Sequence, residues 1–364
     1  MAIKYLSATP AARLRGTALL RLDFNTEDNW RMVAVLPTIK LLLKTSAKIV
    51  IVSHKGRPAG VQRKFSLRKN AGTLSRLLKR KLFFMPHFQF AQIKKQIEAA
   101  PKGSIFLLEN LRFLKGEEAN DAALAKQLAS LADFYVNDAF AVSHRANASV
   151  VAITKFLPHY AGLELESEIT SLSRAMLQPK HPLVMILGGA KAADKLGIIK
   201  YFKSKTDWFL LGGGPANTIL AMKGMDVKRS VRDTNTKDLG ALKPLLKWPK
   251  VILPTDFVWH NDRMLDLGPK SVAAFAQKIA GARTIVWSGP LGAIETTRFA
   301  RASVAIARAV IKNKKAFSVA GGGETVMFLK QYGLDKKFSF ISTGGGAMVD
   351  FLGGKKLPGI EALK

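Results

Sequence analysis

The chain of 364 residues contains no cysteine, which excludes disulfide bonds, thiolate metal sites and thiol nucleophiles. It has no uninterrupted apolar stretch near the ~20 residues that span a bilayer, and its first residues lack the apolar centre of a signal peptide. These absences predict a cytoplasmic protein with no membrane partner. What is present, 48% hydrophobic and 9% aromatic residues, is enough for folded cores, and the length favours two or three domains.

Acidic residues are also scarce: 57 Lys and Arg stand against 26 Asp and Glu, which gives a net charge of +31. The shortage is greatest from Asn29 to Ile97, where 16 basic residues occur without a single acidic one. Three explanations compete, namely a site for polyanionic metabolites, a surface for nucleic acid or membranes, and a generally basic exterior. The count alone favours the basic exterior.

Short apolar runs rich in Val, Ile, Leu and Phe alternate with helical patterns, which is typical of βαβ units around buried parallel sheets. In the first half the pattern predicts strands in the runs 18–24, 48–54, 104–110 and 133–138, and helices at 36–46, 71–81 and 118–132. In the second half four apolar runs each end in a glycine cluster, at 183–190, 208–214, 316–323 and 338–346. A helical pattern at 161–177 predicts a connecting helix between two lobes that permits a hinge.

The carboxyl ends of parallel strands are where open α/β sheets bind ligands, and in the first half these ends carry polar residues. They include Asp23, Asn25, His54, Glu109, Asn137 and Asp138. Five arginines lie at the same ends or in the loops that follow: Arg21, Arg31, Arg57, Arg112 and Arg145. Guanidinium groups present paired donors in one plane, which suits phosphate and carboxylate. One such arginine is usually a surface residue, but five in one lobe indicate a small, highly charged substrate.

In the second half, glycines at the strand ends allow backbone N–H groups and helix amino ends to approach an anion closely. The segment 188-GGAKAADK-195 places Lys191 and Lys195 four residues apart, on one predicted helix face. These lysines either contact phosphoryl oxygens or form a solvated pair, and the segment alone does not decide between the two. In 321-GGGET-325, Glu324 directly follows a glycine loop, where its carboxylate could bind Mg²⁺ together with phosphates.

Eleven strings in this order resemble the phosphoglycerate kinase family from about Leu20 to Leu363. Among them are 21-RLDFN-25, 53-SHKGRP-58, 109-ENLRF-113, 136-VNDAFAVSHRANAS-149, 188-GGAKAADK-195, 212-GGGPANT-218, 287-WSGPLGAIE-295 and 321-GGGET-325. The resemblance implies an α/β fold of two Rossmann-like lobes with parallel sheets, three-layer αβα, joined by a hinge helix. It places a phosphoglycerate-binding lobe at 1–160 with a tail at about 350–364, the interdomain helix at 161–178, and a nucleotide-binding lobe at 179–349.

The resemblance also implies a reaction, the reversible transfer of a phosphoryl group between 1,3-bisphosphoglycerate and ADP to give 3-phosphoglycerate and ATP. This reaction belongs to glycolysis and gluconeogenesis, with Mg²⁺ accompanying the nucleotide and a monomer expected. The substrate-binding residues it implies are Asp23, Asn25, Arg31, His54, Arg57, Arg112 and Arg145. Those implied for the nucleotide are Lys191, Lys195, Gly212, Gly213, Glu295, Gly321, Gly322, Gly323, Glu324 and Thr325, with Glu324 as metal ligand.

At the migrating phosphoryl group we expect Arg31 and Lys191, helped by backbone N–H groups of Gly322 and Gly323 and of the 344–346 turn. Since the attacking oxygen is already ionised, catalysis should consist of positioning and charge stabilisation after the hinge closes and water is expelled. These are expectations from the resemblance.

The sequence departs from the family pattern at several positions, mostly in the nucleotide lobe. Glu324 stands where the family usually has Asp, Ser288 where it has Asn, and Pro215 where Met is common. Asn147 replaces a histidine in the substrate lobe, and Ala302-Ser303 replace the usual Gly-Thr. An alternative therefore stays open, a non-catalytic relative that binds nucleic acid or another polyanion through its basic lobe. Steeply salt-dependent nucleic-acid binding without turnover would favour that alternative.

Overall fold

The computed structural model describes residues 2–26 and 28–364. The chain forms two compact units: unit 1 comprises Met1–Ile169 with Lys356–Lys364, and unit 2 comprises Thr170–Lys355. The division falls within helix α7 (Leu163–Leu177). The last segment of unit 1 begins at Lys356 rather than near residue 350, because α14 (Gly346–Leu352) packs against α8 (Leu196–Phe202) in unit 2. In the described part of the chain no helix is both long enough and apolar enough to cross a membrane.

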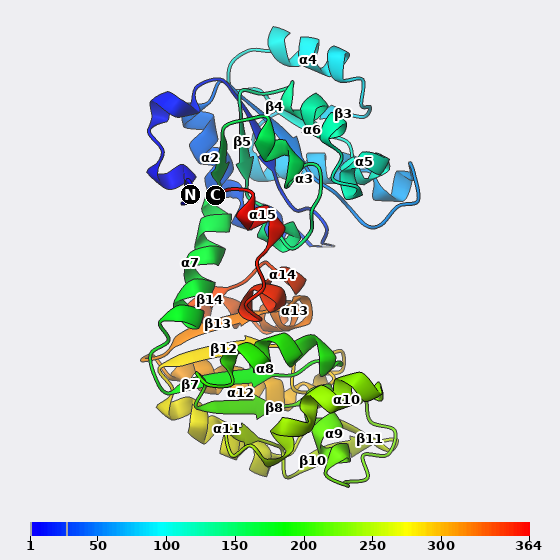
Figure 1. Cartoon of the computed structure of the whole chain (residues 1–364), viewed down its shortest axis with the longest axis vertical. Helices are drawn as coiled ribbons and strands as arrows, with labels where there is room; N and C mark the ends of the chain where they lie inside the picture. Colours follow the sequence, from blue (N-terminus) through cyan, green and yellow to red (C-terminus); the bar gives the residue numbers. More distant parts are fainter. Residues whose placement is uncertain (1, 27) are drawn as a thin grey trace. The chain divides into compact units, whose positions relative to one another are not determined.

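Unit 1 is built on a sheet of six parallel strands (Figure 1). Their spatial order is β3 (Phe83–Met85), β4 (Ile105–Leu108), β2 (Lys48–Val52), β1 (Thr17–Arg21), β5 (Phe134–Asn137) and β6 (His159–Ala161). All residues of β4 and β5 are buried, so helices cover both faces of the sheet, as parallel sheets require. The predicted strands are present but end earlier than their apolar runs, so the polar residues Asp23, His54 and Asp138 lie in the loops beyond.

The helices of unit 1 follow the strands in βαβ order. The α-helices are α1 (Trp30–Ala34), α2 (Leu36–Thr45), α3 (Arg68–Leu78), α4 (Phe90–Ala99), α5 (Lys115–Glu118), α6 (Ala122–Ala129) and α15 (Pro358–Glu361). Short 3₁₀ helices are η1 (Leu6–Ala8), η2 (Ala11–Leu14), η3 (Arg63–Phe65), η4 (Leu111–Phe113), η5 (Phe140–Val142) and η6 (Ala152–Lys155).

The C-terminal segment completes the core of unit 1. Leu357, Ile360 and Leu363 are buried, and the N–H of Gly359 donates to the carbonyl of Ser143 over 2.8 Å. A Cβ at Gly359 would overlap Val150, so only glycine allows this close approach. The segment is therefore an integral part of the unit that holds the basic strand-end residues.

Side chains of unit 1 stabilise the start of α7. The hydroxyl of Thr38 accepts from the N–H of Leu163 over 3.0 Å, and a carboxylate oxygen of Asp138 accepts from that of Leu165 over 2.9 Å. These two bonds satisfy donors that the first turn of a helix leaves free. Burial raises the pKa of Asp138 to about 7, with the hydrogen bonds from Thr38 and Leu165 opposing that shift.

Unit 2 contains a second sheet of six parallel strands. Their order is β14 (Phe340–Ile341), β13 (Phe317–Gly321), β12 (Thr284–Ser288), β7 (Leu183–Leu187), β8 (Trp208–Leu211) and β9 (Val251–Ile252). Renumbered along this unit, the order is 6-5-4-1-2-3, the doubly wound Rossmann arrangement. The order reverses between β7 and β12, and this is the place where such sheets bind ligands. Two Rossmann-like α/β units confirm the predicted fold class.

The remaining elements of unit 2 flank this sheet (Figure 1). They are α9 (Gly213–Met222), α10 (Thr236–Leu242), α11 (Pro269–Gly281), α12 (Arg301–Lys312), α13 (Gly323–Gln331), and the 3₁₀ helices η7 (Ala193–Lys195), η8 (Lys243–Lys247), η9 (Thr297–Phe299) and η10 (Asp335–Lys337). An antiparallel ribbon of β10 (Phe257–His260) and β11 (Arg263–Leu267) was not predicted. Its turn residues Asn261 and Asp262 both have positive φ, 47° and 59°, as a two-residue hairpin turn requires.

Candidate active site

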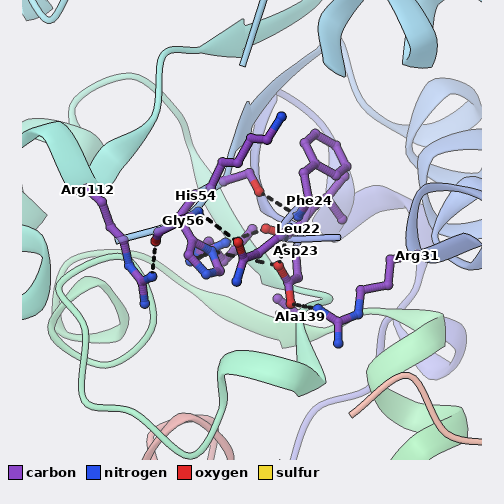
Figure 2. A network of polar contacts seen from close by, with 12 residues as sticks. Leu22, Asp23, Phe24, Arg31, His54, Gly56, Arg112 and Ala139 are labelled. Atoms are coloured by element: carbon purple, nitrogen blue, oxygen red, sulfur yellow. Dashed lines mark hydrogen bonds and ion pairs between the residues drawn. The ribbon is translucent and has the colours of Figure 1, made fainter. Parts of the chain in front are cut away.

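In unit 1, Asp23 lies just beyond β1 and holds two of the predicted substrate-binding residues in place (Figure 2). One carboxylate oxygen accepts from Nη1 of Arg31 over 2.6 Å, and the other accepts from the N–H of Asn25 over 2.8 Å. Burial opposes ionisation of Asp23, yet neighbouring His54 and Arg31 outweigh it and lower its pKa. Nε of Arg31 is buried and has no hydrogen-bond partner among the described residues, which leaves one donor for a ligand.

His54 follows β2 and is almost completely buried, with 2% of its surface exposed. Burial, reinforced by Arg21, Arg112 and Arg145 and opposed by Asp23, lowers its pKa well below the usual value. The ring is therefore neutral at pH 7. Its Nδ1 lies 3.2 Å from Nη2 of Arg21, and since a guanidinium can only donate, Nδ1 accepts. The proton then resides on Nε2, which makes this atom a donor for an anion.

Arg21 was predicted among the anion-binding arginines, and the structure corrects this. Its side chain is 1% exposed, and it donates from Nε to Ser149 Oγ over 2.8 Å and from Nη1 to the carbonyl of Leu22. Glu117, fully buried, has a carboxylate oxygen 3.8 Å from Nη2 of Arg21. Arg21 therefore has a structural role beneath the strand-end residues. Its donors are occupied by groups of the protein, and its charge is balanced by Glu117.

The other predicted residues of unit 1 lie in the loops around this network. Arg112, in η4, donates from Nη1 to the carbonyl of Gly56 (Figure 2). Its Nε is 3.2 Å from exposed Glu118. Arg57 is exposed in the loop after β2, where the N–H of Gly56 donates to the side chain of Asn25 over 2.7 Å. Arg145 is half-buried, with its Nε donating to His144 Nε2 over 3.2 Å. The lowered pKa of His54 reflects the charges of both Arg112 and Arg145, which places them near it.

In unit 2, a cavity of about 790 Å³ opens at the carboxyl ends of the strands. It is lined by the predicted residues Lys191, Lys195, Gly322, Gly323, Glu324 and Thr325, and by Gly345 and Gly346 of the 344–346 turn. Lys191 and Lys195 differ from expectation, because Lys191 lies in the loop before η7 and does not share a helix face with Lys195. Lys191 is exposed, whereas Lys195 is 9% exposed and donates to Ser288 Oγ over 3.1 Å.

The glycine clusters serve two different purposes. The N–H of Gly214 donates to the carbonyl of Gly189 over 2.8 Å, and that of Gly212 to Leu187 over 3.0 Å, so these donors join neighbouring loops and are not free for phosphate. A Cβ at Gly214 would overlap the carbonyl of Ala190. Gly322 and Gly323, by contrast, have no backbone contact closer than ordinary van der Waals distance at the Cβ position and begin α13 at the cavity wall. Both clusters begin a helix, α9 at Gly213 and α13 at Gly323, and the second of these helix amino ends lies at the wall of the larger cavity.

Two further predicted residues, Gly321 and Thr325, have structural contacts of their own. A Cβ at Gly321 would overlap Sδ of Met348. The hydroxyl of Thr325 is buried and accepts from the N–H of Gly289 over 2.9 Å, which ties the end of β12 to α13. Its side chain therefore orders the cavity wall.

A second, more apolar cavity of about 200 Å³ adjoins the first and shares Gly189, Ala190 and Glu324 with it. Its lining includes the predicted residues Gly213 and Glu295, together with Phe257, Met264 and Leu291. Asp266 is also there, and burial raises its pKa to about 6. The unpredicted ribbon β10–β11 thus provides one wall of this cavity. Apolar walls with a few polar groups suit a flat ring system.

Glu324 suits a divalent cation only if a bound ligand supplies further oxygen atoms to that cation. Its carboxylate is exposed in the first turn of α13 at the cavity wall, and no group of three His, Cys, Asp or Glu that could hold a metal occurs among residues 2–26 and 28–364. Mg²⁺ bound with phosphates typically takes one or two carboxylates and completes its shell with phosphate oxygens and water. The carboxylate of Glu324, at the wall of a cavity that Asp194 and Asp350 also line, meets that requirement.

Arginines around a neutral histidine on one α/β unit, and a lysine- and glycine-lined cavity on another, are the features expected of a nucleotide-dependent phosphotransferase. Residues 15–355 match the family model described as phosphoglycerate kinase. Phosphoglycerate kinases of Geobacter metallireducens and Dictyoglomus turgidum are 40% and 38% identical to this chain, covering 100% and 95% of it and 99% and 95% of their own lengths. The chain belongs to the phosphoglycerate kinase family.

Solved structures agree with this assignment. The phosphoglycerate kinase from Pyrococcus horikoshii has a TM-score of 0.88 at 30% identity, covering 99% of this chain and 98% of its own. That from Coxiella burnetii has a TM-score of 0.85 at 32% identity, covering 100% and 99%. The predicted family and activity are confirmed: the chain is a kinase that transfers a phosphoryl group reversibly between 1,3-bisphosphoglycerate and ADP, a step of glycolysis. The alternative of a non-catalytic nucleic-acid-binding relative finds no support in these comparisons.

Proposed function

We propose that unit 1 binds 3-phosphoglycerate or 1,3-bisphosphoglycerate through the predicted arginines and His54. The observation that supports this is the set of donors left free around Asp23: Nε of Arg31, the protonated Nε2 of neutral His54, and the exposed guanidinium of Arg57. A neutral histidine donates without adding charge, so the arginines supply the electrostatic attraction. Asn25 and Asp23 order these groups, and Arg112 and Arg145 extend the positive surface.

We propose that unit 2 binds the nucleotide, with its phosphates in the larger cavity and its base in the apolar one. Lys191 and Lys195 contact the phosphates, the N–H groups of Gly322 and Gly323 face them at the start of α13, and Glu295 lies near the ribose. Glu324 would hold Mg²⁺, which, when bound, neutralises phosphate charge. Gly212, Gly213, Gly321 and Thr325 keep the loops in the shape that this requires.

In the reaction, Arg31 and Lys191 stabilise the charge on the migrating phosphoryl group. No general base is needed, because the attacking phosphate or carboxylate oxygen is already ionised. Donors held in place before the reaction cost little reorganisation as charge develops. We propose that the enzyme acts as a monomer in the cytoplasm.

The role of Lys191 is tested by Lys191→Ala in a coupled assay of ATP-dependent turnover of 3-phosphoglycerate. Loss of a cation that acts in the transition state should lower kcat about 100-fold or more and leave KM for either substrate nearly unchanged. Lys200→Ala, which removes an exposed lysine from the adjacent α8, serves as control and should retain full activity. An effect confined to KM would contradict the proposed role.

A further inference from the structure

Ser288 is the last residue of β12 and lies beside the point where the strand order of unit 2 reverses. It is completely buried, and its hydroxyl accepts a hydrogen bond from Nζ of Lys195 over 3.1 Å. A serine at this position departs from the asparagine of the family pattern. Both asparagine and serine offer a neutral oxygen as acceptor, but serine does so from a shorter side chain.

Among residues 2–26 and 28–364, Lys195 has no other partner that would fix its ammonium group. No carboxylate of the described residues lies within 4.0 Å of Nζ, and Asp194 and Glu324 act on it only at longer range. An ammonium group has three N–H donors, so one bond to Ser288 leaves two for the cavity. Because the hydroxyl is neutral, it holds the ammonium in place without cancelling its charge, as a carboxylate would.

The surroundings of Ser288 connect it to the loop that begins α13. A Cβ built at Gly322 would lie 3.8 Å from Ser288 Oγ and 3.7 Å from Thr325 Oγ1, so both hydroxyls lie beside this glycine. Thr325 in turn accepts from the N–H of Gly289, the residue after Ser288. The ammonium of Lys195 and the amino end of α13 are therefore held to the same end of β12.

We infer that Ser288 is a positioning residue, which holds the ammonium of Lys195 at the floor of the cavity so that its two free donors meet the phosphates of the nucleotide. This inference rests on the proposed nucleotide site. Ser288 does not contact the substrate, since it is completely buried, and acts only through Lys195.

The hydrogen bond has a measurable consequence for protonation. Burial lowers the pKa of Lys195, while Asp194 and Glu324 oppose that effect. The charged side chains of Lys191, Asp350 and Lys355 line the same cavity and contribute to its potential. An acceptor for the ammonium stabilises its charged form, so loss of the Ser288 hydroxyl should lower the pKa of Lys195 further. As the pH is raised, activity that depends on charged Lys195 should therefore disappear at a lower pH in the variant than in the unaltered enzyme.

The test compares Ser288→Ala and Ser288→Asn, with kcat and the KM for each substrate measured across neutral and alkaline pH. Ser288→Ala should lower kcat about 10-fold, leave the affinity for the phosphoglycerate substrate unchanged, and move the alkaline limb of the kcat profile to lower pH. Ser288→Asn, which restores an acceptor, should recover both the kcat and the position of the alkaline limb. Ser318→Ala, a buried serine at the opposite end of neighbouring β13, is the matched control and should change neither.

An alkaline limb at the same pH in Ser288→Ala as in the unaltered enzyme would overturn the inference, as would a failure of Ser288→Asn to recover it. If Ser288→Ala does not fold, Ser288→Gly, which also removes the hydroxyl, should show the same shift, and no shift there would also overturn it. Lys195→Ala distinguishes a failure of the proposed nucleotide site from a failure of the inference about Ser288. If that variant keeps its activity, the proposed nucleotide site is wrong; if it loses activity while Ser288→Ala does not, only the inference about Ser288 fails.

Discussion

The two units hold their ligand-binding groups in opposite ways. In unit 1 the site rests on charged side chains whose buried partners come from distant parts of the chain, as with Arg21 and Glu117. In unit 2 the cavity rests on backbone loops joined by their own N–H and carbonyl groups, with glycines where loops touch. The difference suits the ligands, since a small acid with several charges needs directed forks, whereas a phosphate chain is matched by helix amino ends and lysines.

The two units should therefore be destabilised by different kinds of substitution. A buried ion network fails when one charge is removed, because the remaining charge is left without compensation. A set of packed loops fails when volume is added, because backbone cannot move aside as a side chain can. Unit 1 should therefore be sensitive to changes of charge, and unit 2 to changes of size.

The largest effect is expected in unit 1 from Glu117→Gln. The amide keeps the shape of the side chain but leaves the buried guanidinium of Arg21 unbalanced, which should cost about 3–5 kcal/mol in the free energy of unfolding. Urea unfolding measures this. Glu98→Gln, at an exposed glutamate of α4, is the control and should change stability by less than about 0.5 kcal/mol. Equal stability of the two variants would show that the network does not support unit 1.

Gly214→Ala should have the next largest effect, in unit 2. The added methyl group meets the backbone carbonyl of Ala190, so the 188–190 loop must shift, at a cost of about 1–3 kcal/mol. Affinity for the nucleotide should fall, while affinity for 3-phosphoglycerate stays the same; calorimetric titration with each ligand measures both. Gly281→Ala is the control, because the end of α11 has open space at the Cβ position. Unchanged nucleotide affinity in Gly214→Ala would mean that the packed loops do not shape the cavity.

The smallest effect is expected from Glu324→Asp, which changes neither charge nor packing. A side chain shorter by one methylene moves the carboxylate away from the cavity, so the Mg²⁺ or Mn²⁺ concentration for half-maximal activity should change severalfold. The affinity for 3-phosphoglycerate in unit 1 should not change. Glu98→Asp on α4 controls for the substitution itself. If the metal dependence of Glu324→Asp equals that of the unaltered enzyme, Glu324 is not a metal ligand.

The strands and the strand-end residues could be predicted because both depend on local patterns. Buried parallel strands appear as continuous apolar runs, and the ligand-binding residues follow them directly, as Asp23 follows β1. The short edge strand β9 has only two residues, too few for a periodic signal, whereas the equally short β14 lies within the predicted run 338–346. The ribbon β10–β11 did have a signal, since Asn261-Asp262 between alternating residues is typical of a tight hairpin turn.

Partnerships between distant residues could not be predicted from sequence. Arg21 resembles the other strand-end arginines in its position, and only its contacts with Ser149 and Glu117, about a hundred residues away, show that it points inward. Similarly, Lys191 and Lys195 are equivalent by their spacing of four residues. The 3₁₀ turn that begins at Ala193 separates them, and leaves one exposed and the other bound to Ser288.

The segment Lys356–Lys364 also has a consequence for the order in which the chain is made. Ribosomes synthesise these residues after all of Thr170–Lys355, yet they belong to unit 1. Unit 2 can thus fold during synthesis from a continuous stretch of chain, whereas unit 1 must wait with Leu357, Ile360 and Leu363 missing from its core. Synthesis of unit 1 begins first but is completed last. A nascent chain released too early would therefore contain a complete unit 2 and an incomplete unit 1.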